Sequence, residues 1–72
     1  MSIEELSGRI ETAAMEVVDA ERALRTARAA GGMSLGRARI NLRNANRRFM
    51  VALRRYGDAV IEDVRRGAED VR

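Results

Sequence analysis

Residues 27–38 read ARAAGGMSLGRA, and the adjacent glycines in this stretch separate two long patterns of apolar residues. Glycine adopts left-handed backbone conformations without steric cost, so Gly31-Gly32 is expected to end one helix and turn the chain. Ser34 is of a residue type that commonly caps a helix start, and it is expected to cap the next helix. The stretch therefore predicts two helices joined by a tight corner.

Upstream of the glycines, apolar residues recur at alternating spacings of three and four, which is the heptad pattern of a helix that packs along one stripe. They are Ile3, Leu6, Ile10, Ala13, Val17, Ala20, Leu24 and Ala27. Ser2 followed by Glu5 matches the capping-box pattern, so the first helix is predicted over about 3–30. Glu5 and Arg9 are spaced for an i, i+4 ion pair along it.

Downstream, the same spacing predicts a second helix over about 35–71, with large residues alternating with alanine. Its stripe consists of Leu35, Ala38, Leu42, Ala45, Phe49, Ala52, Tyr56 and Ala59. Large side chains set over alanine allow two helices to approach closely. Gly57 followed by Asp58 leaves a break in this helix open, although a continuous helix is favoured. Gly8 is expected at the level of Gly57, where paired glycines indicate either a close approach by a partner or simple tolerance near helix ends.

A hairpin of these helices is expected to leave apolar surface uncovered. The second helix is the longer, so pairing should stop near Ile61 and leave Val64 without a neighbour. Apolar residues also lie outside the strict stripes: Ala14, Met15, Val18, Ile40, Met50, Val51, Leu53 and Val60. A 72-residue chain buries too little surface for a robust core. Without Cys or His it lacks disulfides and the commonest metal ligand.

We therefore predict a single all-α domain over residues 1–72, a two-helix antiparallel hairpin that dimerises into an antiparallel four-helix bundle. The residues expected to form the core and the dimer seam are Ile10, Val17, Leu24, Leu35, Leu42, Phe49, Tyr56, Ala38, Ala45 and Ala52.

Charge is arranged in blocks along the sequence. Residues 1–21 carry six acids and one Arg, residues 22–57 carry ten Arg and no acid, and residues 58–72 carry five acids and three Arg. Folding at the glycines would make the corner basic and the other end acidic. A head-to-tail pair of hairpins would place each basic end beside an acidic one, as a two-fold dimer allows.

A stripe of Arg and apolar residues is the candidate partner-binding surface. It runs along the second helix, away from the Leu/Ala stripe, and comprises Ile40, Arg43, Asn44, Arg47, Val51 and Arg54. Arg beside apolar side chains is typical of protein interfaces, whereas the same Arg could follow phosphates, or the stripe could simply face solvent. Phe49 and Tyr56, the two aromatic residues, fall on the core stripe, so no platform for stacking bases is expected. A host protein is therefore favoured over nucleic acid.

No catalytic function is indicated. Adjacent carboxylates such as Glu62 and Asp63 point to different sides of a helix, and nothing assembles a base, a nucleophile and an oxyanion donor. We expect a non-enzymatic protein with no cofactor, metal or small-molecule substrate. The sequence shows no signal peptide and no apolar stretch of membrane-spanning length, so a soluble, cytoplasmic protein that does not bind membranes is expected.

The layers from Leu35 and Ala38 to Tyr56 and Ala59 resemble those of the Rop family of plasmid copy-number proteins, helical hairpins that dimerise into antiparallel four-helix bundles. That resemblance covers most of the chain but departs from Rop at the Gly-Gly turn, and Rop's RNA-contacting residues are not matched to particular residues of this sequence. The resemblance implies the dimeric fold, with RNA or DNA binding as the alternative function. In size and shape alone, the chain is also similar to small phage-encoded anti-quorum-sensing and anti-CRISPR inhibitors, which implies a regulator that binds a host protein.

Overall fold

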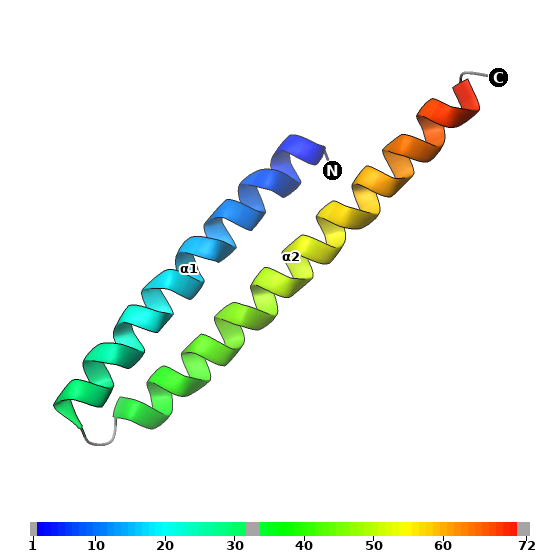
Figure 1. The fold of residues 1–72 in the computed structure, drawn as a ribbon. Coiled ribbons are helices and arrows are strands. Elements are labelled where there is room, and N and C mark those ends of the chain that lie inside the picture. Colours follow the sequence, from blue (N-terminus) through cyan, green and yellow to red (C-terminus); the bar gives the residue numbers. More distant parts are fainter. Residues whose placement is uncertain (1, 32–33, 71–72) are drawn as a thin grey trace.

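The computed structural model describes residues 2–31 and 34–70, which form two antiparallel helices. Helix α1 spans Ile3–Ala30 and helix α2 spans Ser34–Asp70. They lie side by side in a rod of 63 × 15 × 15 Å (Figure 1). The predicted all-α antiparallel hairpin is therefore confirmed.

The helix bounds agree closely with those predicted. Helix α1 has the expected limits, whereas α2 begins one residue early, so Ser34 belongs to the helix instead of capping it. The spacing of apolar residues locates a helix end only to within a residue or two, which accounts for this difference. Residue 71, the expected end of α2, and Gly32, in the expected turn, lie outside the described residues.

Local hydrogen bonds fix both ends of α1. The Ser2 hydroxyl oxygen accepts a hydrogen bond from the Glu5 backbone N–H at 3.1 Å, as the capping pattern predicts. At the other end Gly31 has φ 73° and ψ 175°, a positive-φ conformation that favours glycine, and its N–H donates to the Ala27 carbonyl oxygen at 2.9 Å. The first glycine of the pair thus ends the helix as expected.

The core of the hairpin lies along the line where the two helices touch, and alanine dominates it. Its buried side chains are Leu6, Ala13, Leu24, Ala27, Ala38 and Ala45. Leu24, Ala27 and Ala38 form a cluster against which Leu35 and Leu42 pack, so large side chains do sit beside alanine. The other large seam residues are only half-buried: Ile10, Val17, Leu35, Leu42, Phe49 and Tyr56. One hairpin therefore leaves much of its apolar seam incompletely covered.

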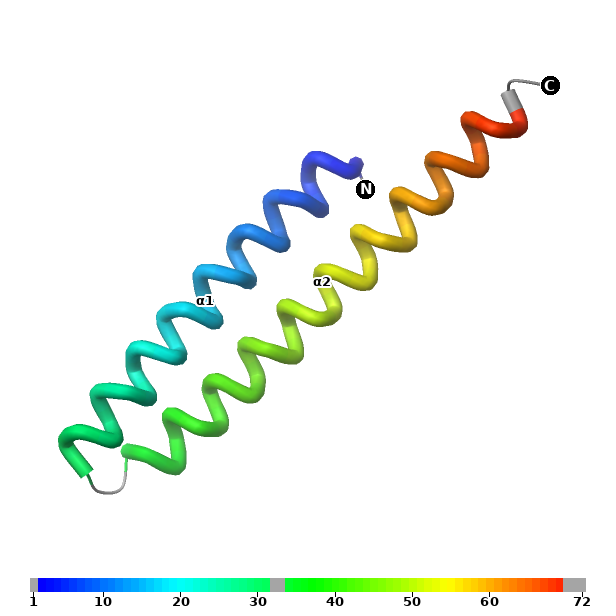
Figure 2. Tube along the Cα trace, in the orientation of Figure 1, coloured from blue at the N-terminus to red at the C-terminus, as the bar shows by residue number. Residues whose placement is uncertain are grey.

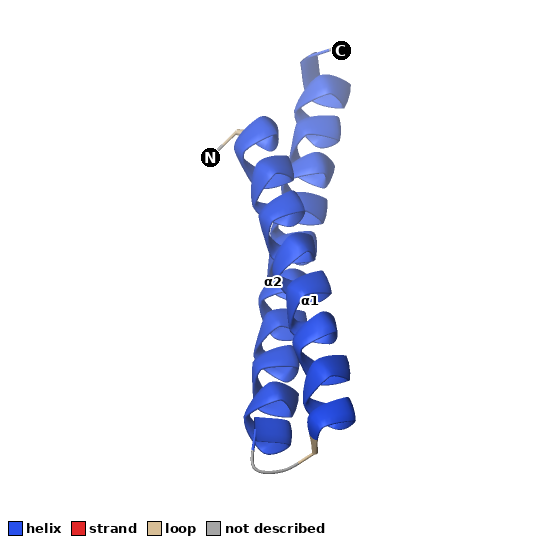
Figure 3. Cartoon of the chain, turned by 90° about the vertical axis from the view of Figure 1, so that its left-hand side faces the viewer, coloured by secondary structure: helices blue, strands red, loops and turns tan. Residues whose placement is uncertain are grey.

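Seen from the side, the two helices cross as they run along the rod, as expected of a coiled pair (Figure 3). Helix α2 is continuous through Gly57, which settles the alternative left open by the sequence. Its last turns project beyond the start of α1 (Figure 2). Ile61, level with the start of α1, is 52% exposed, and Val64, farther along α2, is 66% exposed, in agreement with the predicted end of pairing.

Candidate interaction surface

The contact line of the hairpin, defined by Leu6 and Ala13 in α1 and by Ala38 and Ala45 in α2, has a different chemistry on each side. Each residue advances a helix by about 100°. The residues three positions after and one position before a contact-line residue therefore lie on one side of the rod. The residues four positions after and one position after it lie on the opposite side. The two sides of the rod are therefore described separately.

The side at positions four after and one after the contact line carries six apolar residues from both helices, which we call the apolar face. It consists of Ile10, Ala14 and Val17 from α1 and of Leu42, Phe49 and Leu53 from α2. All are half-buried except Leu53, which is 38% exposed. Not every residue on this side is apolar: Ser7, Arg39 and Asn46, each one position after a contact-line residue, lie there as well. The six apolar residues form an apolar surface that both helices share.

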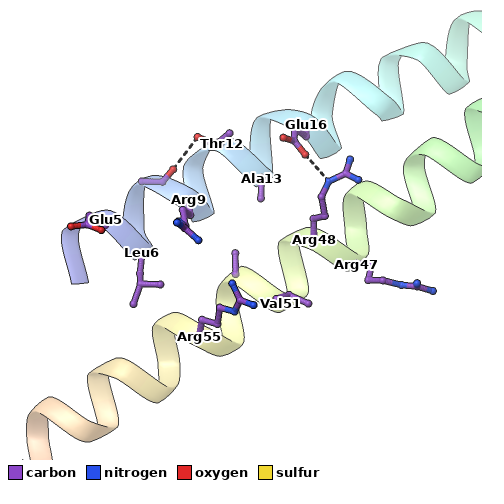
Figure 4. Close-up of a pocket in the computed structure, with 12 residues that line it drawn as sticks. Glu5, Leu6, Arg9, Thr12, Ala13, Glu16, Arg47, Arg48, Val51 and Arg55 are labelled. Atoms are coloured by element: carbon purple, nitrogen blue, oxygen red, sulfur yellow. Dashed lines mark hydrogen bonds and ion pairs between the residues drawn. The ribbon is translucent and has the colours of Figure 1, made fainter. Parts of the chain in front are cut away.

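The opposite side of the contact line holds an open groove of about 840 Å³ between the two helices (Figure 4). Its apolar floor consists of Leu6, Ala13, Val51 and Ala52. Its charged residues are Glu5, Arg9, Glu16, Arg47, Arg48 and Arg55, and Gly8 and Thr12 complete the lining. The lining holds four Arg and two Glu, so the groove is basic with an apolar floor.

An ion pair between the helices lies at the end of this groove nearer the turn. Arg48 Nε donates a hydrogen bond to Glu16 Oε2 at 2.9 Å (Figure 4), with both side chains substantially exposed. Arg9 and Arg55 extend toward the groove from opposite walls. In the described part of the chain, neither has a carboxylate oxygen within 4.0 Å. The predicted Glu5–Arg9 pair is wrong: Arg9 extends toward the groove instead, and an exposed pair contributes too little free energy for the i, i+4 spacing alone to decide where its side chains lie.

The predicted partner-binding residues form a continuous exposed strip on α2, which we call the outer stripe. Its members are Ile40, Arg43, Asn44, Arg47, Val51 and Arg54, all exposed. Ile40 and Val51 are 58% and 44% exposed, which is high for branched aliphatic side chains. Arg47 points away from α1 (Figure 4). Arg47 and Val51 also line the groove, so the two surfaces are continuous.

The predicted seam residues all lie on the contact line or the apolar face, buried or half-buried. Sequence reasoning missed the groove, because it examined each helix for its apolar stripe and its outer surface but not for the flank between them. A signal was available. Arg9 and Glu16 are seven residues apart, as are Arg48 and Arg55, so each pair occupies a single heptad position beside the contact line.

Across residues 2–31 and 34–70, no cluster of three or more Asp or Glu residues could hold a metal ion. Within the same ranges, neither helix has a stretch apolar and long enough to cross a membrane. The glycines mark no close approach inside the hairpin, because a Cβ atom placed on Gly8 or Gly57 would meet no other atom within 4 Å.

No family model matches the chain, and neither the curated proteins nor the solved structures include a significant match.

Proposed function

We propose that this chain is a non-enzymatic interaction module. Two copies pair through their apolar faces into an antiparallel four-helix bundle, and the outer stripe of α2 binds a partner protein. The observation that carries the proposal is the incomplete core: four of the six buried side chains are alanine, and most of the large seam residues are only half-buried. A second copy laid on the apolar face would complete their burial. Because these side chains are already partly buried, each would add only part of the roughly 1.5–3 kcal/mol that full burial of an exposed Val, Leu or Phe contributes.

The distribution of charge supports a head-to-tail pair. Val17 and Phe49 lie near the middle of the paired length, so a two-fold axis there would bring apolar side chains together. The basic turn of each hairpin would then lie beside the acidic end of its partner. On the groove side the same axis would instead bring Arg47 and Arg48 of one copy against those of the other, which is unfavourable. The apolar face is therefore the proposed dimer surface.

The outer stripe supports a protein partner over nucleic acid. It combines exposed aliphatic side chains with Arg, and interface hot spots combine apolar burial with Arg anchors. Phe49 and Tyr56 are half-buried in the seam and present no platform to stack a base. We propose that the dimer acts as a small inhibitor or regulator, by covering a surface of a host regulatory or DNA-binding protein.

Unfolding at several protein concentrations tests the dimer. If folding requires a second copy, the midpoint of thermal unfolding rises with protein concentration by mass action. A midpoint of thermal unfolding that stays constant over a roughly hundredfold range of protein concentration would contradict the proposed dimer.

A titration with duplex DNA and structured RNA tests the choice of partner. At about 150 mM salt we expect no binding tighter than the non-specific range, with dissociation constants of about 10⁻⁴ to 10⁻⁶ M. Submicromolar binding that is lost on Arg43→Ala and Arg47→Ala but kept on Val51→Ala would favour a nucleic-acid ligand instead. The Val51 variant is the matched control because it alters the same stripe without removing a charge.

A further inference from the structure

The groove has features of a binding site that neither the hairpin fold nor the apolar-face dimer uses. It lies on the side of the contact line opposite the apolar face, so pairing of two copies leaves it open. Arg9 and Arg55 reach toward it from opposite helices, with no carboxylate of the described residues within 4.0 Å. The two guanidinium groups would bind carboxylates on the two flanks of a ligand, and the apolar floor would contact an apolar strip between those flanks.

We propose that this groove binds an acidic amphipathic helix of a partner protein, with carboxylates on Arg9 and Arg55 and apolar side chains on the floor. The proposal rests on the proposed function, since it names the chemistry of the partner. Because Arg47 and Val51 belong to both surfaces, a helix in the groove would contact the edge of the outer stripe. An amphipathic helix laid in a hydrophobic groove is a recurrent mode of recognition.

The shape of the groove fits a third helix along the rod. The lining residues of α1 extend from Glu5 to Glu16, which is about three turns at 1.5 Å per residue. Gly8 lacks a side chain on the α1 wall, and a Cβ placed there would meet nothing within 4 Å, so the wall stays open. The ion pair of Glu16 with Arg48 bounds the groove toward the turn.

Two other occupants fit the groove less well. A phosphate backbone would meet the carboxylates of Glu5 and Glu16 and would gain nothing from the apolar floor. A second copy in two-fold register would bring Arg47 and Arg48 against their own equivalents. An acidic helix matches both the excess of Arg and the floor, so charge complementarity selects it.

The test uses two synthetic helical peptides of about 15 residues, cross-linked to stay helical, because free helices of this length are marginal in water. One carries glutamate along the flanks of a leucine stripe, and the other carries glutamine in place of each glutamate. We expect the glutamate peptide to bind the full-length protein about tenfold more tightly than the glutamine peptide near physiological salt, a factor that two partly exposed ion pairs supply.

Variants then locate the binding. The double variant Arg9→Gln, Arg55→Gln should abolish the tenfold preference for glutamate. Its matched control, Arg22→Gln with Arg65→Gln, removes two exposed arginines outside the groove and should keep the preference. Gly8→Leu should weaken both peptides by filling the groove, while circular dichroism shows the helices intact, because open space surrounds that position.

Each alternative outcome would overturn the inference. Equal binding of the two peptides, or the same loss in both double variants, would show that Arg9 and Arg55 do not select the ligand. Submicromolar binding of duplex DNA or RNA that depends on these two residues would assign the groove to nucleic acid, and assemblies larger than a dimer that depend on them would assign it to a second copy. Sedimentation of the same samples separates the two proposals. A dimer without the glutamate preference refutes the groove alone, whereas a monomer with it refutes the dimer alone.

Discussion

Arg48 Nε lies 2.9 Å from Glu16 Oε2, and this contact joins the acidic first block of the sequence to the basic middle block across the two helices. Both side chains are largely exposed, at 59% for Arg48 and 44% for Glu16. In residues 2–31 and 34–70 the other ion pair, between Arg66 and Glu62, lies within α2. The inter-helix pair therefore adds little to the stability of the hairpin, since exposed ion pairs contribute little free energy.

A double-mutant cycle on Glu16→Gln and Arg48→Gln measures that contribution. We expect a coupling of about 0.2–1 kcal/mol in the free energy of urea unfolding, falling as salt is added. Glu11→Gln combined with Arg48→Gln is the control, because Glu11 is exposed and forms no ion pair with Arg48. A coupling that is unchanged in high salt would show that the pair is not the screened surface contact described here.

Enlarging Ala45 tests the close approach of the helices. Ala45 is only 1% exposed, so Ala45→Leu forces extra volume into a filled contact. It should lower the free energy of unfolding by about 1–3 kcal/mol. Ala23→Leu, at an exposed alanine of α1, adds the same volume and should change stability by no more than about 0.5 kcal/mol. Equal stability of the two variants would mean that the alanine line is not tightly packed.

Glycine substitutions at two positions should have opposite effects. Gly57 lies inside α2 with open space around it, so Gly57→Ala should stabilise the protein by about 0.5–1 kcal/mol through the reduced entropy of the unfolded chain. Gly31 ends α1 with φ 73°, where a side chain is strained, so Gly31→Ala should destabilise it by about 1–2 kcal/mol. Thermal unfolding checks both signs, and a stabilising Gly31→Ala would contradict the positive-φ cap.

The hairpin itself could be predicted from the sequence because its determinants are local. The heptad spacing, the Ser2 cap and the glycine at Gly31 each act within a few residues, and they set the limits of α1. Exposure of Ile61 and Val64 followed from the unequal lengths of the helices. Each of these features can be recognised from the sequence pattern and the lengths of the two helices, without knowledge of particular side-chain contacts.

The groove and its ion pair could not be predicted in the same way. Glu16 and Arg48 are 32 residues apart, and their contact depends on the register of the two helices and on chosen side-chain rotamers. The Glu5–Arg9 pair expected from local spacing does not form. Exposed ion pairs contribute little free energy, so the spacing of residue types does not determine which of them form.

Cysteine cross-linking tests the direction of pairing, and the absence of native Cys makes single substitutions unambiguous. The two variants are Ala30→Cys and Ile61→Cys. Ala30 lies beside the turn, at the end of α1, and Ile61 lies beside the start of α1. In a head-to-tail dimer, oxidation of Ala30→Cys alone should give no linked dimer, whereas a mixture of the two variants should give one. Efficient linkage of Ala30→Cys to itself would place both turns at the same end.

The most direct test of the account is the mass of the folded protein in solution. Sedimentation equilibrium at micromolar concentration should give about 16 kDa, twice the 8.0 kDa of one chain. Phe49→Asp, which puts a charge in the middle of the apolar face, should lower that mass toward a single chain, whereas Ile40→Asp on the outer stripe should leave it unchanged. A fully helical 8.0 kDa monomer in the unmodified protein, stable at micromolar concentration, would contradict the claim that the apolar face needs a second copy.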